Sequence, residues 1–243
     1  MPEGPSIVLL KELVDGFTGK AAIEVSGYSK IDQSRLLNKK ISAFKSWGKH
    51  FLICCKGLSL RVHFLLFGSY RINEKKDSPV RLHLKFKKGE INLYACAIKY
   101  LEGDVALHYD FTSDVMNGEW NPKNARAKLK AMPDVLICDA LFDQDIFSGV
   151  GNSIKNEILY RVKIHPQSGV EKIPTVKIEK LIDEIPVYSF QFLEWKRNFE
   201  LKQHWLAHTK KICSRCKGAI IKINTGHSKR RSFVCANCQR IYQ

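Results

Sequence analysis

The chain has 243 residues, 44% of them hydrophobic, so it can bury substantial cores and extended disorder is excluded. Its 40 lysines and arginines outnumber 24 acidic residues, which gives a formal net charge of +16. A balance this basic indicates a polyanionic partner, most simply nucleic acid, although a generally basic surface or a membrane surface would carry the same charge.

Membrane insertion and secretion are not indicated. No apolar run approaches the ~18 residues of a spanning helix, and charged side chains interrupt any signal-peptide pattern near the start, at Glu3, Lys11, Glu12 and Asp15. We therefore expect a cytoplasmic protein, associated with the nucleoid if the source is bacterial, with no membrane partner.

The chain opens with Met1-Pro2-Glu3-Gly4-Pro5. If Met1 is removed, Pro2 presents a secondary amine, and an α-amino group with a pKa of about 7.7–8.0 is partly neutral and nucleophilic at physiological pH. Glu3 follows directly and could move protons beside that amine. On these five residues alone, an ordinary N-terminal turn is the better interpretation.

Helical spacing of apolar residues predicts a helix over residues 6–17, which would anchor the N-terminus on a rigid element. After it the pattern changes to short β-type runs separated by turns. Seven strands are predicted, at residues 21–25, 40–46, 50–54, 58–63, 69–72, 81–86 and 91–95. Strands at this spacing indicate a sandwich or a flattened barrel.

Two turns between these strands carry candidate DNA contacts. Lys49 follows Gly48, where its ammonium could reach a phosphate or sugar, or could be one more surface lysine. The second turn contains Leu65, Leu66 and Phe67. Their apolar side chains are either buried strand residues or an exposed wedge that enters a base stack.

The second half of the chain is predicted to be helical. Helices are expected at residues 122–132, 139–143, 152–160, 175–185 and 189–207. The helix at Asn152 follows a glycine-containing turn, so its N-terminus could bind a phosphate, with Asn152 as a donor. Asn152 as a helix cap alone is an equally good interpretation.

The most specific motif lies near the end of the chain. Cys213-x2-Cys216 and Cys235-x2-Cys238 are separated by eighteen residues, a spacing typical of a four-thiolate zinc site. We expect one structural Zn²⁺ per chain, because so short a segment has too little core to fold without metal. Disulfides are the alternative. The other cysteines are expected in the core, at Cys54, Cys55, Cys96 and Cys138.

Arg230 and Arg231 are expected on the loop of the hairpin between the two cysteine pairs. A guanidinium there could hold a phosphate in bidentate fashion, although an ordinary basic loop has the same sequence.

In this order, these features resemble the formamidopyrimidine-DNA glycosylase and endonuclease VIII family of bifunctional DNA repair enzymes. The resemblance covers essentially the whole chain. It implies an α+β multidomain protein: an N-terminal β-sandwich with an N-terminal helix at residues 1–118, a helical domain with a helix–two-turn–helix motif at 119–206, and a zinc-ribbon hairpin at 207–243.

The resemblance also implies roles for the candidate residues. Pro2 matches the nucleophile that attacks C1′ and forms an iminium, and Glu3 matches the acid that assists base loss and sugar opening. Lys49 matches a lysine that assists β-elimination, and Arg230 an arginine that holds the flanking phosphate and assists δ-elimination.

Other positions match DNA contacts. Asn152 matches the asparagine that binds backbone phosphate, and Glu157 a glutamate of structural role on the same helix. The segment that fills the gap left by a flipped-out nucleotide falls on Leu65, Leu66 and Phe67. The implied partner is double-stranded DNA containing damaged bases or abasic sites, bound by a monomer.

Three departures bear on the substrate. Position 6 is Ser6, where many members carry a glutamate. Residues 94–99 lack the Asp-Pro-Arg-Arg-Phe-Gly run of the formamidopyrimidine branch, and residues 185–213 lack its glycine- and serine-rich capping loop. The two missing segments favour the endonuclease VIII branch and hence oxidised pyrimidines.

We therefore predict a DNA glycosylase and AP lyase of base excision repair, acting through a proline iminium followed by β,δ-elimination. Ser6 leaves open a catalytically silent DNA-binding protein of the same fold. A zinc-ribbon transcription or ribosomal factor would explain the C-terminus but gives the N-terminal motif no role.

Overall fold

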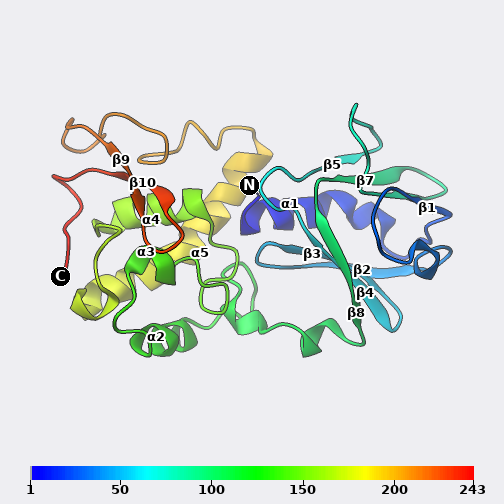
Figure 1. The fold of residues 1–243 in the computed structure, drawn as a ribbon, viewed down its shortest axis with the longest axis horizontal. Coiled ribbons are helices and arrows are strands. Elements are labelled where there is room, and N and C mark those ends of the chain that lie inside the picture. Colours follow the sequence, from blue (N-terminus) through cyan, green and yellow to red (C-terminus); the bar gives the residue numbers. More distant parts are fainter. Residues whose placement is uncertain (1) are drawn as a thin grey trace. The chain divides into compact units, whose positions relative to one another are not determined.

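The computed structural model describes residues 2–243 and is drawn in Figure 1. Contacts divide these residues into two compact units. The first unit comprises Pro2 and Ser6–Asp110, and the second comprises Glu3–Pro5 and Phe111–Gln243. The helical and hairpin segments, expected as separate domains at 119–206 and 207–243, thus share one unit. None of the helices among the described residues combines the length and apolarity needed to cross a bilayer.

The first unit contains most of helix α1 and two four-stranded antiparallel sheets. Helix α1 spans Gly4–Val14 and is extended by a 3-10 turn, η1, at Asp15–Phe17. One sheet has the order β2-β3-β4-β8 and the other β1-β6-β7-β5. The strands are β1 Glu24–Ser26, β2 Ile41–Trp47, β3 His50–Cys55, β4 Leu58–His63, β5 Ser69–Ile72, β6 Leu82–Lys85, β7 Glu90–Tyr94 and β8 Ala97–Glu102.

A single hydrophobic core joins the helix to both sheets. Ile7, Leu10 and Val14 lie three or four residues apart on α1 and are fully buried, as an amphipathic helix requires. They belong to one cluster with buried side chains of both sheets, among them Phe51 of β3 and Leu84 of β6. This arrangement confirms the predicted N-terminal helix and sandwich.

Strand β8 was not predicted. Most of its side chains are exposed or half-buried, and only Leu101 is buried, so the stretch lacks the clear apolar alternation of a strand. It pairs with β4 in a register that sets Lys99 opposite Arg61. Strand β8 therefore places the Lys99 side chain beside Arg61 of β4, so two cations are neighbours on this sheet.

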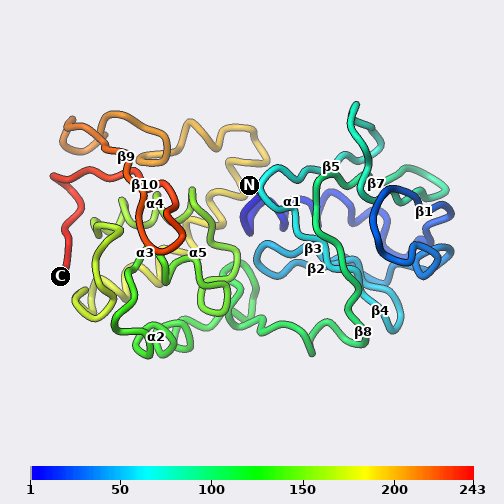
Figure 2. The backbone as a smooth tube through the Cα atoms, in the orientation of Figure 1, coloured from blue at the N-terminus to red at the C-terminus, as the bar shows by residue number. Residues whose placement is uncertain are grey.

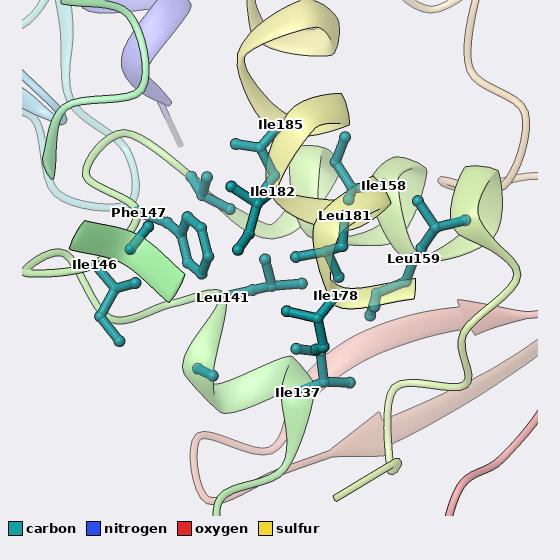
Figure 3. Close-up of a cluster of buried hydrophobic side chains, with 14 of the residues drawn as sticks. Ile137, Leu141, Ile146, Phe147, Ile158, Leu159, Ile178, Leu181, Ile182 and Ile185 are labelled. Atoms are coloured by element: carbon teal, nitrogen blue, oxygen red, sulfur yellow. The ribbon is translucent and has the colours of Figure 1, made fainter. Parts of the chain in front are cut away.

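The second unit is mainly helical. Its helices are α2 Pro122–Lys130, α3 Ile137–Ala140, α4 Asn152–Val162 and α5 Thr175–Arg197. Figure 3 shows the core between them, where Ile158 and Leu159 of α4 face Ile178, Leu181 and Ile182 of α5. Eight of the eleven residues of α4 are buried, so this helix is the centre of the unit.

The structure corrects two helix predictions. The helices expected at 175–185 and 189–207 are one helix, α5, with Pro186 in its interior. Packing of buried residues on both sides of Pro186 against α4 offsets the hydrogen bond that a proline cannot donate. Residues 198–207 are not helical, and their backbone can be followed as the orange trace in Figure 2. The helix expected at 139–143 begins earlier, as α3.

A two-stranded hairpin follows, formed by β9 Ile221–Thr225 and β10 Arg230–Val234. Arg230 is paired with Thr225 and is the first residue of β10, so the prediction that it lies on the hairpin loop is wrong. Its side chain leaves the hairpin next to the turn at residues 226–229.

Candidate active site and metal centre

Glu3 is almost completely buried, with 3% of its surface exposed. Its carboxylate accepts hydrogen bonds from the backbone N–H of Ser153 at 2.8 Å and of Ile154 at 3.1 Å, and from the Ser153 hydroxyl at 2.6 Å. These N–H groups are in the first turn of α4, where backbone donors have no partner within the helix. The Glu3 carboxylate therefore caps α4, and the helix dipole favours its negative charge.

Glycines make this approach possible. Gly151 precedes α4, and a Cβ at that position would lie 2.4 Å from Glu3 side-chain atoms. Gly149 has φ +99°, in the left-handed region that favours glycine, and its carbonyl accepts a hydrogen bond from the Gly4 N–H at 2.9 Å. The Gly149-Val150-Gly151 turn is thus shaped to receive the start of the chain.

This geometry corrects the expectation for the start of α4. The N-cap residue is Gly151, and Asn152 is the first residue of the helix rather than its cap. Two of the N–H groups expected to hold a phosphate are bonded to Glu3 instead. The Asn152 side-chain oxygen is buried and accepts no hydrogen bond from residues 2–243, so it could accept one from a ligand that donates.

Glu157, further along α4, is fully buried and has a structural role. Its carboxylate accepts hydrogen bonds from the backbone N–H groups of Leu206, Ala207 and His208, at 2.8–3.1 Å. It therefore fixes the segment that leads from α5 into the hairpin.

Lys155 and Asn156 lie on α4 between the partners of Glu3 and Glu157, and neither is part of a motif that the sequence reveals. Both are buried, and both contact β10. Lysines are rarely buried, and nothing in the local sequence distinguishes Lys155 from a solvent-exposed lysine.

The four cysteines of the two C-x2-C pairs come together. Their sulfur atoms all lie within 4.8 Å of one another, with Cys213 and Cys238 3.8 Å apart and Cys216 and Cys235 3.4 Å apart. A disulfide needs about 2.05 Å, so these separations exclude the disulfide alternative. A tetrahedron with Zn–S bonds of about 2.3 Å has edges of about 3.8 Å, which this cluster approaches. The cluster can hold one metal ion.

The segment that carries the first cysteine pair also packs on α4. The Tyr160 hydroxyl lies 3.1 Å from the Cys213 sulfur, and Arg215 donates to the Tyr160 carbonyl at 2.7 Å. Tyr160 and Cys213 belong to one buried cluster with Ala207 and Cys235. The metal cluster is therefore joined to the helix that carries Asn152.

In the first unit, Lys49 is half-buried in the turn between β2 and β3, after Gly48 with φ +49°. The pKa of its neighbour His50 is lowered to about 3 by burial and by nearby positive charges, of Arg61, His63, Lys99 and Lys49. His50 is therefore neutral at pH 7. The same environment shows that Lys49 lies in an electropositive part of the sheet.

Leu65, Leu66 and Phe67 are exposed in the structure, by 48%, 48% and 82%. They occupy a tight turn after the buried Phe64, closed by a hydrogen bond from the Gly68 N–H to the Phe64 carbonyl at 2.8 Å. The interpretation as buried strand residues is therefore wrong, and the role as a wedge in a base stack stays a prediction. Three apolar side chains are thus displayed together on one turn.

Residues 112–188 match a family model described as the formamidopyrimidine-DNA glycosylase H2TH domain. This range contains α4 with Asn152 and Glu157. A structure of Lactococcus lactis formamidopyrimidine DNA glycosylase bound to DNA with an AP site has the same fold, with a TM-score of 0.87, 20% identity and coverage of 98% of this chain and 99% of that one.

Curated relatives agree with the fold. The DNA-(apurinic or apyrimidinic site) lyase Nei2 of Mycolicibacterium smegmatis is 25% identical over 257 residues, covering 98% of this chain and 99% of the relative. The chain belongs to the formamidopyrimidine-DNA glycosylase and endonuclease VIII family.

Within this family, the chain is on the endonuclease VIII-like side. Endonuclease 8-like 2 of Bos taurus is 31% identical over 198 residues, which cover 74% of this chain and 58% of the relative. Endonuclease 8-like 3 of Bos taurus is 27% identical over 242 residues, 93% of this chain. The chain spans only 39% of the length of that second relative.

Proposed function

We propose that the protein is a DNA glycosylase and AP lyase that removes oxidised bases from double-stranded DNA. The observation that carries the proposal is the buried Glu3 carboxylate bonded to the first turn of α4. It supports a role for the N-terminal peptide as part of a built site rather than as a free end. Family membership supports the same activity class.

Pro2 is the proposed nucleophile, in a chain whose first residue after processing is Pro2. Met1, whose removal this requires, lies outside the described residues. The neutral imino nitrogen attacks C1′ of the damaged nucleoside, the glycosidic bond breaks, and its electron pair leaves with the base. Loss of the amine proton and opening of the sugar give an iminium, and Glu3 is the group proposed to assist these proton transfers.

The strand is then cut by elimination. The iminium makes the C2′ proton acidic, and its removal expels the 3′ phosphate in β-elimination. Lys49 is proposed to assist this step and Arg230 the following δ-elimination, which expels the 5′ phosphate. Both are cations that the DNA phosphates would attract, and the other cations around His50 support a phosphate-facing surface beside Lys49.

Asn152 is the proposed contact of the helical unit to the DNA backbone. A phosphate only accepts hydrogen bonds, so this contact would be made by the side-chain NH₂ group of Asn152 as donor. Leu65, Leu66 and Phe67 are proposed to enter the space left when the damaged nucleotide leaves the stack, and their exposure on one turn supports this role.

We propose Zn²⁺ as the metal of the Cys213, Cys216, Cys235 and Cys238 cluster, because four thiolates at this spacing favour it. The ion would hold the hairpin folded. Metal analysis of the purified protein is expected to give one zinc per chain, with loss of metal in Cys213→Ser. Iron as the bound metal would contradict the assignment.

Oxidised pyrimidines are the proposed substrates. Support comes from the endonuclease 8-like relatives and from the missing Asp-Pro-Arg-Arg-Phe-Gly run and capping loop. Single-turnover rates on duplexes with thymine glycol, dihydrouracil or 8-oxoguanine test the choice, and fastest excision of 8-oxoguanine would contradict it.

Borohydride trapping on a duplex with an abasic site tests the activity itself. Reduction of an iminium leaves a covalent protein–DNA adduct of lower electrophoretic mobility. An adduct is expected with the native protein and none with a variant whose N-terminus carries a tag. A protein that shifts the duplex but never forms the adduct would be the catalytically silent DNA-binding protein.

A further inference from the structure

A side chain of helix α4 forms hydrogen bonds with the edge of β10 that β9 leaves free. One edge of β10 is paired with β9, and its other edge meets Asn156 of α4. The Asn156 side-chain amide donates to the Arg231 carbonyl at 3.2 Å and accepts from the Phe233 N–H at 3.0 Å. One side chain thus satisfies both a donor and an acceptor of β10, as a neighbouring strand would.

Lys155, which precedes Asn156 on α4, binds the same strand. It is fully buried, and its ammonium donates to the Ser232 hydroxyl at 2.8 Å and to the Arg231 carbonyl at 3.3 Å. Burial lowers its pKa to about 8. Burying a charged amine is costly, and an apolar side chain would fill the same space without that cost. The presence of a buried ammonium is therefore better explained by its hydrogen bonds to β10, which fix the position of that strand, than by a contribution to stability.

A third contact fixes the turn of the hairpin. Asp139 of α3 accepts a hydrogen bond from the His227 N–H, with both carboxylate oxygens at 3.1 Å. Gly226 has φ +69°, and a Cβ at this position would lie 2.2 Å from Asp139. The turn is thus held at one end by Asp139 and at the other by the contacts of Lys155 and Asn156 to Arg231.

Arg230 lies between these fixed points. In a strand, residues two apart share a face, so the Arg230 side chain leaves on the same face as Ser232. Ser232 is fully buried against Lys155. A slip of β10 by one residue would bring Arg231 to that face in place of Arg230.

We infer that Asp139, Lys155 and Asn156 form a binding site for the hairpin, called the seat, that sets the register of β10. The seat thereby positions the Arg230 guanidinium on the DNA phosphate that it is proposed to hold. These three are positioning residues, and the inference rests on the proposed function, in which Arg230 holds the phosphate that flanks the damaged nucleotide. The seat is formed by residues of α3 and α4. Because α4 also carries Asn152, the proposed DNA contacts of Asn152 and Arg230 are positioned by the same pair of helices.

Lys155→Met tests the seat, because methionine keeps the apolar stem and removes the ammonium. Binding to a duplex with a tetrahydrofuran abasic analogue is measured at several salt concentrations. The slope of log K against log salt is expected to fall by about one, the amount for one lost phosphate contact. Arg230→Ala is expected to give the same loss, and the double variant no more than Arg230→Ala alone.

Lys177→Met is the matched control. Lys177 also donates to a backbone carbonyl of α4, that of Val162, at 3.0 Å, but at the end away from Asn152. Its slope is expected to equal that of the native protein. Zinc content, measured on every variant, is expected to stay at the native value. Should Lys155→Met lose zinc, Asp139→Ala takes its place with the same expected slope.

Two results would overturn the seat: a native slope in the zinc-retaining variant, or a double variant whose losses add. Both are read from binding alone. Borohydride trapping of the native protein tests the proposed chemistry separately, so the seat and the catalytic proposal can fail independently.

Discussion

Glu3, Lys155 and Glu157 are charged side chains that the structure buries, and each holds a backbone segment in place. Glu3 binds the start of α4, Lys155 binds β10, and Glu157 binds the segment before the hairpin. Such charges are costly unless their hydrogen bonds are satisfied. Here backbone groups supply partners, so the charges fix geometry around α4.

The substitution Glu3→Gln tests how much the Glu3 carboxylate stabilises the start of α4. The two carboxylate oxygens of Glu3 accept from Ser153 and from Ile154 separately, so a glutamine keeps one acceptor and sets its NH₂ group against the other backbone N–H. The unfolding free energy is expected to fall by about 1–3 kcal/mol in urea denaturation. Ser153→Ala, which removes only the hydroxyl contact, should cost less, about 0.5–1.5 kcal/mol. Native stability of Glu3→Gln would show that the cap contributes nothing.

The sequence could not predict this cap. Glu3 and its partners are some 150 residues apart in the chain, and local spacing carries no information on such contacts. Asn152 looked like the cap because its residue type and place fit the local rule. The distant carboxylate took the site, and only the three-dimensional structure shows it.

Arg230→Ala tests the phosphate contact. Arg230 is exposed at the start of β10, next to the turn that Asp139 holds. Losing one phosphate contact should lower the salt slope of DNA binding by about one and weaken binding to all sequences alike. Arg240→Ala, at an exposed arginine outside the hairpin, serves as control. A native slope in Arg230→Ala would remove Arg230 from the proposed phosphate contacts.

At the scale of elements, α5 shows how packing overrides a local signal. Pro186 lies inside the helix, where it cannot donate to the Ile182 carbonyl. Buried residues on both sides, including Leu181 and Tyr188, keep the helix continuous. A break at proline was a reasonable expectation, because the sequence does not reveal how much packing lies on either side of it.

Pro186→Ala is therefore expected to stabilise the protein. Alanine restores the missing donor and has the highest helix propensity, so the unfolding free energy should rise by about 1–3 kcal/mol. Val187→Ala, at an exposed neighbour, should change it by no more than about 0.5 kcal/mol. A clear loss of stability in Pro186→Ala would mean that the proline ring packs usefully in the native helix.

Elements with strong local signals were predicted well, and those defined by their neighbours were not. The cysteine cluster and the existence of α2 follow from spacing and residue type alone. Strand β8 forms because β4 offers it an edge, and its own side chains give little indication. Likewise the seat on α4 exists only because β10 folds against it.

For the whole molecule, the buried and positively charged surroundings of His50 make the free energy of unfolding depend on pH. The folded-state pKa of His50 is about 3, below the 6.5 of an unperturbed histidine. Between these values the unfolded chain binds a proton that the folded chain does not. The contribution of His50 to the stability of the folded state is therefore fully present above pH 6.5 and is lost progressively as the pH falls toward 3.

His50→Phe tests this pH dependence, since phenylalanine keeps a ring and cannot titrate. Urea midpoints at pH 7 and pH 5 should differ less in the variant than in the native protein. His227→Phe, at an exposed histidine of the hairpin turn, should leave the native difference unchanged. Equal pH dependence in His50→Phe and the native protein would contradict the buried neutral His50.

The proposed chemistry requires that the imino nitrogen of Pro2 forms the covalent bond to the sugar. Peptide mapping by mass spectrometry of the borohydride-reduced adduct identifies the residue that carries this bond. A sugar-derived mass is expected on the N-terminal peptide that begins at Pro2. An adduct on a lysine, such as Lys49 or Lys155, with an unmodified N-terminal peptide would contradict it.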